Sequence, residues 1–197
     1  MKSKFTCITA LLFLSLVSFS SKVVAENQKK TVDFTTNLII SPGYHDFVQS
    51  HFPSASGIGG WVGLGAGLIY NINEQTSIIP GVDFLMNAIK IDYYSYYYNS
   101  SNTYTNTIFL PKIVGRYQFQ PKSPSPFIEA ELNYNLPSSE LFNFESGGIG
   151  CSGMLGYQFG GVLRIQAGYE YIPVKTSYAN SGSVNMGGFV AKAGFSF

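Results

Sequence analysis

The chain has 197 residues, with 12 basic and 11 acidic side chains and a formal net charge of +1. Charged residues make up only 12% of the sequence, whereas aromatic residues make up 16% and there are 21 glycines. This composition excludes a disordered chain, which is rich in charge and poor in aromatic residues. The near balance of charge, without a basic run, also argues against a nucleic-acid partner.

Residues 1–25 have the pattern of a secretory signal peptide. Lys2 and Lys4 form the positive n-region, residues 8–19 the apolar h-region, and residues 23–25 a small-residue cleavage site. The apolar stretch is shorter than the roughly twenty residues that a transmembrane helix requires. We therefore expect a removed signal peptide at 1–25, a short segment at 26–30 and one domain at 31–197.

The expected mature chain is slightly acidic and has a single cysteine. Removal of the signal peptide takes away three lysines, which leaves nine basic and eleven acidic residues and a net charge of −2. Cys151 is alone, so no internal disulfide can form. No apolar run of about eighteen residues remains, so a membrane crossing would have to use strands.

Alternation of apolar and polar residues predicts eight strands in chain order. The predicted strands are 31–40, 58–71, 77–91, 104–119, 127–136, 148–159, 162–173 and 185–197. Short connections at 72–76, 120–126 and 160–161 alternate with long ones at 41–57, 92–103, 137–147 and 174–184. Short turns at one end and long loops at the other are typical of outer-membrane barrels. The predicted fold is all-β, an eight-stranded antiparallel up-and-down transmembrane β-barrel.

Each predicted strand has one apolar, aromatic-rich face and one face with polar side chains and glycine. Eight strands enclose a lumen just wide enough for side chains, and the aromatic face is too bulky to fill it. We therefore expect the polar face inside and the aromatic face in lipid. Same-face pairing of strands 148–159 and 162–173 also requires a three-residue loop at 160–162.

The polar face predicts an ionic network inside the barrel. Its members are Asp33, Asp83, Lys112, Arg116, Glu129, Glu131, Arg164, Glu170 and Lys192. If strands 104–119 and 127–136 pair around residues 122 and 123, Arg116 lies opposite Glu129 and Lys112 lies near Glu131. Buried charges persist when they are paired. The network is interpreted either as a packed ionic core or as the lining of a narrow, charge-gated pore.

Pairs of aromatic residues close several strands at the same expected end. The sequence Tyr-Gln-Phe ends two strands, and the chain itself ends in Phe-Ser-Phe. Such rings are typical of a girdle at a membrane–water boundary. The predicted periplasmic girdle consists of Tyr70, Tyr117, Phe119, Tyr157, Phe159, Phe195 and Phe197.

With the signal peptide, the eight strands, the Tyr-x-Phe closures and the terminal Phe197, the chain resembles the small outer-membrane barrels. This group includes the OmpA transmembrane domain, OmpX and the opacity-type surface proteins. The resemblance implies a location in the bacterial outer membrane, with both termini in the periplasm. It also implies recognition of the last strand by the barrel-assembly machinery, contact with outer-membrane lipid and lipopolysaccharide, and a monomeric state.

The long segment 92–103 is the main candidate for external interactions. It carries Tyr93, Tyr94, Tyr96, Tyr97 and Tyr98, followed by Asn and Ser residues. Tyr, Ser and Asn are the residues of adaptable binding loops, so adhesion to a host or another extracellular ligand is one interpretation. The alternative is that the tyrosines extend an aromatic girdle at the headgroups.

A catalytic role is the third alternative. Barrels that modify lipid A use an external histidine with serine and acidic partners, and His45, Asp92 and Ser95 would be the candidates here. We expect no metal, no cofactor and no catalytic site. Pro80 and Pro111 interrupt two predicted strands. They indicate either a local bulge or a weakened seam that admits lipid from the side.

The sequence thus favours a non-enzymatic surface or structural barrel protein of the outer membrane. A narrow porin that uses the interior charges is the first alternative, and a lipid A-modifying enzyme is the second. Any specific role is expected to reside in the external loops.

Overall fold

The computed structural model describes residues 32–41, 55–57, 60–95, 98–120, 124–139, 144–160, 162–176 and 183–197. These residues form thirteen strands. Within the described ranges, no helix is long and apolar enough to cross a membrane. The predicted signal peptide and the segment 26–30 lie outside the described residues.

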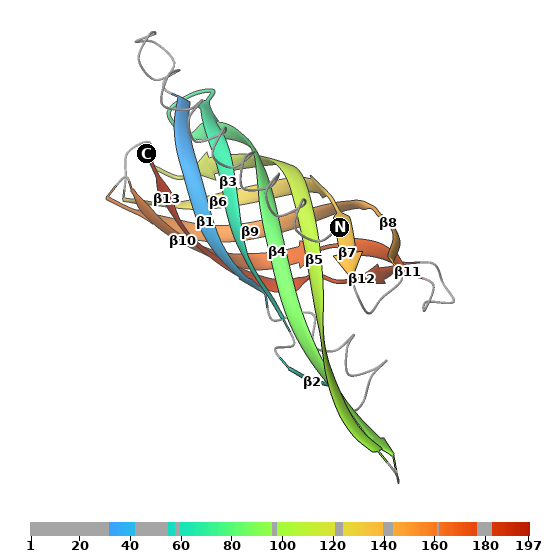
Figure 1. Cartoon of the computed structure of the whole chain (residues 1–197). Helices are drawn as coiled ribbons and strands as arrows, with labels where there is room; N and C mark the ends of the chain where they lie inside the picture. The colour runs from blue at the N-terminus through green and yellow to red at the C-terminus, as the bar shows by residue number, and fades with distance from the viewer. Residues whose placement is uncertain are drawn as a thin grey trace.

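Eight of the strands close into an antiparallel barrel, which confirms the predicted fold (Figure 1). Each strand pairs with its neighbours in the chain, and the first strand pairs with the last to complete the circle. The barrel strands are β1 (Val32–Ser41), β3 (Trp61–Asn71), β4 (Thr76–Ser95), β5 (Tyr98–Gln118), β6 (Ser125–Tyr134), β9 (Ile149–Phe159), β10 (Leu163–Tyr171) and β13 (Gly188–Ser196).

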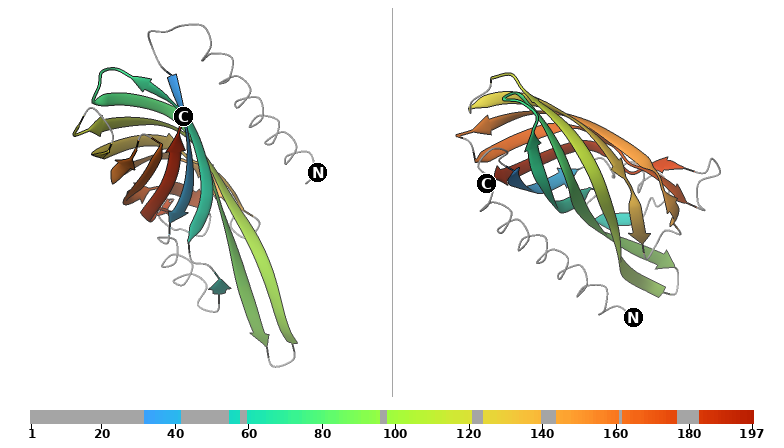
Figure 2. Two further views of the ribbon diagram at one scale, coloured as in Figure 1. Left: turned by 90° about the vertical axis from the view of Figure 1, so that its left-hand side faces the viewer. Right: turned by 90° about the horizontal axis from the view of Figure 1, so that it is seen from above.

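At one end of the barrel, where β4 and β5 project (Figure 2), short additional strands extend the wall or form a second sheet. β2 (Ala55–Gly57) continues the wall beside β4, and β7 (Leu136–Ser139) continues it beside β5. β8 (Phe144–Gly147), β11 (Pro173–Thr176) and β12 (Val184–Asn185) form a three-stranded sheet of their own. We call this end, from which β4 and β5 project, the hairpin end. The opposite end, which holds the C-terminus, is the girdle end.

The hairpin formed by β4 and β5 corrects the sequence prediction of a loop at 92–103. The two strands continue through this segment, and Ser95↔Tyr98 is their last pair. β4 has 20 residues and β5 has 21, whereas a tilted strand needs about 9–11 residues to cross a membrane. About half of each strand therefore lies beyond the length that a crossing needs (Figure 1).

Other predicted loops also contain strands. Parts of 41–57, 137–147 and 174–184 belong to β2, β7, β8, β11 and β12. The turn between β9 and β10 is as predicted, because Phe159 pairs with Leu163 and leaves a three-residue loop. Gly160 in this loop has a φ of 53°, a left-handed conformation that glycine adopts without steric cost.

Pro80 and Pro111 coincide with gaps in the ladder but not with bulges. The β3–β4 ladder is interrupted between Gly67↔Gly81 and Tyr70↔Ile78, where Pro80 offers no N–H. The β5 ladder is interrupted between Lys112↔Asn133 and Phe109↔Leu136, beside Pro111. The register is the same on both sides of each gap, so the predicted local bulge is wrong.

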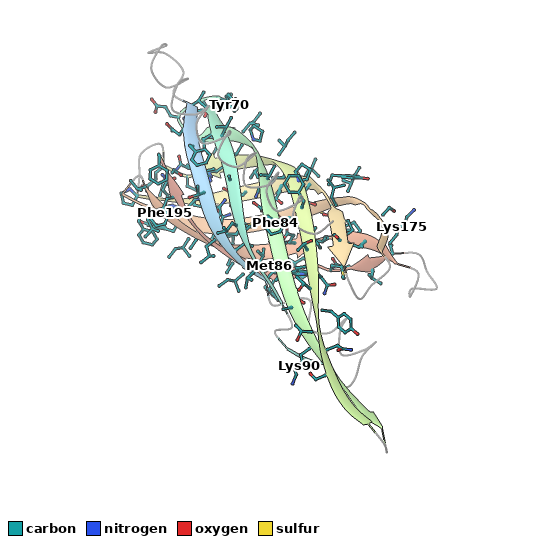
Figure 3. The ribbon with its side chains drawn as sticks, viewed as in Figure 1. Tyr70, Phe84, Met86, Lys90, Lys175 and Phe195 are labelled. Atoms are coloured by element: carbon teal, nitrogen blue, oxygen red, sulfur yellow. The ribbon has the colours of Figure 1, made fainter. Side chains whose placement is uncertain are left out.

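The two faces of the wall differ as predicted, with polar side chains inside and apolar side chains outside (Figure 3). β6 illustrates this, because Glu131 is 3% exposed while its neighbour Leu132 is 64% exposed. Burial alternates along the whole of β6 and β13. This alternation follows from the pleat, which sends successive side chains to opposite faces.

Candidate functional site in the lumen

Two lysines and two carboxylates form a ring in the middle of the lumen. Lys112 Nζ lies 2.6 Å from Asp83 Oδ2 and 3.1 Å from Glu131 Oε2. Lys192 Nζ lies 3.0 Å from the same Asp83 oxygen and 3.3 Å from the same Glu131 oxygen. The side chains come from β4, β5, β6 and β13 and are almost completely buried. This four-charge ring is neutral as a whole and joins walls on different sides of the barrel.

A glycine makes room for the ring. A Cβ atom at Gly65 would lie 2.1 Å from Asp83 Oδ1, which is closer than real atoms approach. Asp83 is directly opposite Gly65 in the β3–β4 ladder. The glycine on the polar face of β3 therefore allows the Asp83 carboxylate to turn into the lumen.

Arg116 and Glu129 form a second, separate ion pair. They are direct partners in the β5–β6 ladder, which confirms the register expected from the sequence. Both Nε and Nη2 of Arg116 lie 2.7 Å from Glu129 Oε1. The Arg116 guanidinium also lies over the Phe127 ring, 4.9 Å from its centroid, a favourable cation–π contact.

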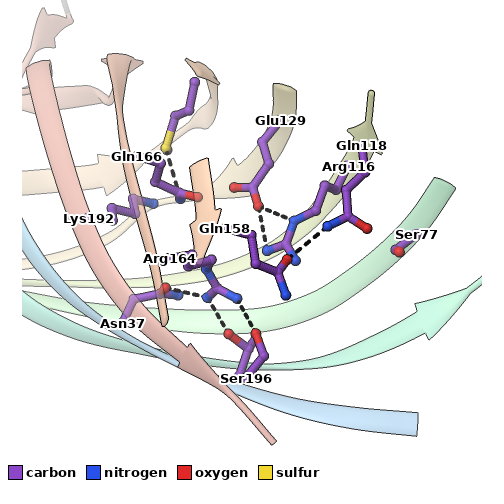
Figure 4. Close-up of polar contacts among 12 residues, drawn as sticks. Asn37, Ser77, Arg116, Gln118, Glu129, Gln158, Arg164, Gln166, Lys192 and Ser196 are labelled. Carbon is purple, nitrogen blue, oxygen red and sulfur yellow. Dashed lines mark hydrogen bonds and ion pairs between the residues drawn. The ribbon is translucent and has the colours of Figure 1, made fainter. Parts of the chain in front are cut away.

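Arg164 is buried and donates its hydrogen bonds to neutral groups (Figure 4). Its Nη1 donates to Ser196 Oγ at 2.8 Å, and its Nη2 donates to Thr35 Oγ1 and Asn37 Oδ1. None of these acceptors carries a charge. Among the described residues, no carboxylate forms an ion pair with this guanidinium.

Glu170 is the negative counterpart of Arg164. It is 1% exposed, and neither carboxylate oxygen has a hydrogen-bond partner within the described part of the chain. It lies six residues from Arg164 on β10, a separation of about 20 Å along a strand. The two charges therefore cannot neutralise each other directly.

Asp33 lies outside this interior set. It is half-buried at the girdle end of β1, where its carboxylate contacts the Asn71 side chain. The predicted network is thus divided into the four-charge ring, the Arg116–Glu129 pair, two single charges and a peripheral aspartate.

An apolar layer, absent from the sequence-based predictions, fills the lumen on the hairpin side of the ring. Its fully buried members include Ile39, Trp61, Leu85, Ile108, Leu110, Ile172, Val174 and Met186. Trp61 Nε1 donates a hydrogen bond of 3.0 Å to the backbone oxygen of Met186, which joins β3 to the segment before β13. The sequence could have predicted this layer. Leu85 is two residues from Asp83 and Leu110 is two residues from Lys112, so each leucine faces the lumen with its charged neighbour.

A small cavity lies on the girdle side of the ring. Its volume is about 10 Å³, which is room for about one water molecule. Charged and polar side chains that line it are Lys112, Arg116, Glu129, Arg164 and Gln166, together with Thr35 and Asn37.

The predicted girdle residues are all exposed on the outer wall. Tyr117 and Phe119, Tyr157 and Phe159, and Phe195 and Phe197 form ring pairs with centroid separations of 5.6, 4.8 and 6.4 Å. Tyr70 and Phe195 lie near the same end of the barrel (Figure 3). Exposed Leu, Ile, Val, Met and Phe side chains continue this surface on every barrel strand. Soluble proteins rarely expose so large an apolar area, so this belt is a lipid-facing surface.

The remaining candidates lie in or near the hairpin. Tyr93, Tyr94, Asp92 and Ser95 belong to β4, and Tyr98 begins β5. Tyr96, Tyr97 and His45 lie outside the described residues, so the structure does not test the proposed grouping of His45 with Asp92 and Ser95. Among the described residues, no group of three or more His, Cys, Asp or Glu side chains could hold a metal ion.

The sequence matches no protein-family model and no curated protein. Among solved structures, the fold is similar to the outer membrane protein OprG from Pseudomonas aeruginosa. The two chains are 13% identical, the match covers 85% of this chain and 97% of that one, and the TM-score is 0.49. A likeness at this level says nothing of activity.

Proposed function

We propose that this chain is a non-enzymatic barrel protein of the bacterial outer membrane, with a closed lumen and a role exerted outside the membrane by the β4–β5 hairpin. The observation that carries the proposal is the length of these two strands, 20 and 21 residues. A strand crosses the membrane with about half that number. The remainder projects beyond the barrel at the hairpin end (Figure 2).

The packing of the lumen supports a role outside the membrane. Eight strands leave no open channel, and here the interior holds the four-charge ring, the Arg116–Glu129 pair and the apolar layer. An ion that crosses from the girdle end would have to enter the apolar layer without its hydration shell, at high energetic cost. These features disfavour the narrow porin.

The outer-membrane location is supported by the surface of the barrel. A closed barrel leaves no unpaired strand edge within lipid, and the outer wall carries an apolar belt with aromatic rings at one end. In the proposed orientation the girdle end faces the periplasm. Lipopolysaccharide surrounds the barrel, and β13 with the terminal Phe197 is the segment that the barrel-assembly machinery recognises. A specific relation to OmpA, OmpX or opacity-type proteins stays a prediction.

The chemistry of the hairpin suggests what it binds. Residues 93–105 contain only Tyr, Ser, Asn and Thr. Such side chains offer contact area and hydrogen bonds without charge, as in antibody loops. We therefore propose an uncharged or weakly charged extracellular partner, such as a host glycan or a matrix protein, rather than a strongly ionic one.

The hairpin can be shortened without a change of register. Asp92 pairs with Ser101, and Ile91 with Asn102, so residues 92–101 can be replaced by an Asn-Gly turn. The shortened protein is expected to fold and to show heat-modifiable gel migration, but to lose adhesion of expressing cells to host cells or matrix. A matched control replaces the short turn at 160–162 with another three-residue loop, and should retain adhesion. Unchanged adhesion by the shortened protein would overturn the proposed role.

Lipid A mass spectra separate the proposed function from the enzymatic alternative. Overexpression of the chain in a Gram-negative host should leave the lipid A acyl pattern unchanged. A new acylated or deacylated species that disappears with His45→Ala would instead establish the lipid A-modifying activity.

A further inference from the structure

The buried charges of the lumen are balanced in number but not in position. Among the described residues, eight ionisable side chains are buried, four basic and four acidic: Lys112, Arg116, Arg164, Lys192, Asp83, Glu129, Glu131 and Glu170. Six of them are neutralised in the ring and in the Arg116–Glu129 pair. Arg164 and Glu170 remain, six residues apart on β10. Among the described residues, the girdle side of the lumen therefore has one positive charge, that of Arg164, without an ion pair.

Arg164 also has an unused donor. Its two terminal nitrogens are occupied by Ser196, Thr35 and Asn37, but Nε has no hydrogen-bond partner among the described residues. The residue is only 1% exposed. A buried guanidinium without a counter-charge is costly, and charges of this kind are normally paired.

The cavity of about 10 Å³ lies against this guanidinium. Three cationic side chains line it, those of Lys112, Arg116 and Arg164, and Glu129 is the one carboxylate among its lining residues. Because Glu129 is held by Arg116 at 2.7 Å and Lys112 by the ring, the charge without a partner at this cavity is that of Arg164.

A half-turn of the Gln166 side-chain amide would add a second donor at the same place. It lines the cavity, and its Oε1 is buried without a partner, while Nε2 contacts Met154 Sδ at 3.3 Å. The two ends of a glutamine amide have the same shape. If the amide is turned by half a rotation, its N–H₂ group faces the cavity and its oxygen replaces nitrogen beside the methionine.

We propose that this cavity binds a small monovalent anion of the halide class, chloride under ordinary conditions, beside Arg164. The anion accepts a hydrogen bond from Arg164 Nε and supplies the missing negative charge on this side of the lumen. A water molecule would fill the same volume and accept the same hydrogen bond, but it would leave the charge of Arg164 uncompensated. This inference is independent of the function proposed for the hairpin.

The ion reaches the cavity from the girdle end. Gln158 is the direct neighbour of Arg164 in the β9–β10 ladder, and Gln118 lies two residues beyond Arg116 toward that end. A hydrogen bond of 2.9 Å joins these two glutamines (Figure 4). Neutral amide side chains therefore line this approach, whereas the apolar layer closes the hairpin end.

Anomalous diffraction from crystals of the refolded full barrel, grown in sodium bromide, tests the site directly. The wild-type protein is expected to give one bromide peak within hydrogen-bond distance of Arg164 Nε, and the Arg164→Gln variant is expected to give none. A wild-type map with water or no density at this position, and no anomalous peak, would overturn the proposal. The presence or absence of the bromide peak in the wild-type crystal tests the proposal even if the variant does not fold.

Thermal unfolding in detergent gives an independent measurement in solution. At matched ionic strength, the midpoint of wild-type unfolding is expected to be about 4 °C higher in chloride than in gluconate. This is the shift that a tenfold stabilisation of the folded state by the bound anion produces in a domain of this size. Glu170→Gln, which removes the other single charge on β10, should keep this difference, and Arg164→Gln should abolish it. Equal midpoints of the wild-type protein in the two salts would contradict anion binding.

Discussion

The two sides of the lumen differ in the chemistry of most of their buried side chains, although a small apolar cluster of Ile69, Ile79 and Val114 lies on the girdle side. In the middle of the lumen four strands contribute a ring of paired charges, and on its girdle side β5 and β6 contribute a second ion pair. On the hairpin side, Trp61, Leu85, Ile108 and Leu110 pack as an apolar layer. Ion pairs specify position but contribute little net stability when buried, whereas apolar packing stabilises without selecting a register. The comparison indicates that most of the packing stability of the lumen comes from the apolar layer, whereas each buried charge in the ring depends on its partners.

The largest expected effect is the loss of one carboxylate from the ring. Glu131→Gln leaves two buried lysines with Asp83 alone, and we expect a loss of about 3–5 kcal/mol in the free energy of unfolding. Urea unfolding in detergent, followed by the fluorescence of the single tryptophan, measures it. The double variant Glu131→Gln/Lys112→Gln restores the charge balance and should recover part of the loss. A change below 1 kcal/mol in the single variant would show that the ring is not a tight ionic unit.

Truncation in the apolar layer should have the next largest effect. Leu110→Ala creates a cavity at a site that is 0% exposed, and we expect a loss of about 2–5 kcal/mol. The same substitution on the outer wall, Leu132→Ala, is the control, because that side chain faces lipid and leaves no internal cavity. Equal losses in the same unfolding assay would contradict the assignment of the layer as a packed core.

Removal of the Trp61 hydrogen bond should have a moderate effect. Trp61→Phe keeps most of the ring volume but loses the donor to Met186 O, and we expect a loss of about 1–2 kcal/mol. Because the variant has no tryptophan, circular dichroism is the appropriate probe of unfolding. A stability equal to that of the wild-type protein would show that the bond between β3 and the segment before β13 contributes nothing measurable.

The smallest effect is expected for Glu170, and it has the opposite sign. Glu170→Gln removes a buried carboxylate that has no hydrogen-bond partner among the described residues, so we expect no loss and a gain of up to about 1 kcal/mol. Urea unfolding of the variant beside Glu131→Gln compares an unpaired with a paired glutamate. A loss as large as that of Glu131→Gln would show that Glu170 has an essential partner.

The sequence predicted the barrel because side-chain alternation is a local property. Glu129 and Glu131 alternate with the apolar residues of their strand, which predicted that both face the lumen. Counting residues outward from the turn between these strands placed Arg116 opposite Glu129. The three-residue loop at 160–162 followed from the same alternation. In each case the contact joins two strands that follow one another in the chain. Such a contact can be predicted from the sequence alone.

The features that were missed depend on contacts between distant strands or on strand length. Lys192 joins Asp83 and Glu131 across the lumen, and no pattern within one strand shows which charges meet there. Arg164 and Glu170 were predicted only as members of the interior network, and that neither forms an ion pair among the described residues depends on the same contacts across the lumen. The hairpin at 92–103 was interpreted as a loop because its Tyr, Ser and Asn residues occur in both loops and exposed strands, and pairing between β4 and β5 decides the outcome.

Planar-bilayer recording of the refolded full barrel tests whether the lumen is closed to ions, as we propose. The wild-type protein is expected to show no conductance steps, because the ring and the apolar layer occupy the lumen. The double variant Leu85→Ala/Leu110→Ala, which removes bulk from the layer alone, is the positive comparison and should show steps if it folds. Reproducible steps from the wild-type protein, altered in size by Lys192→Met, would contradict the sealed lumen and establish a pore.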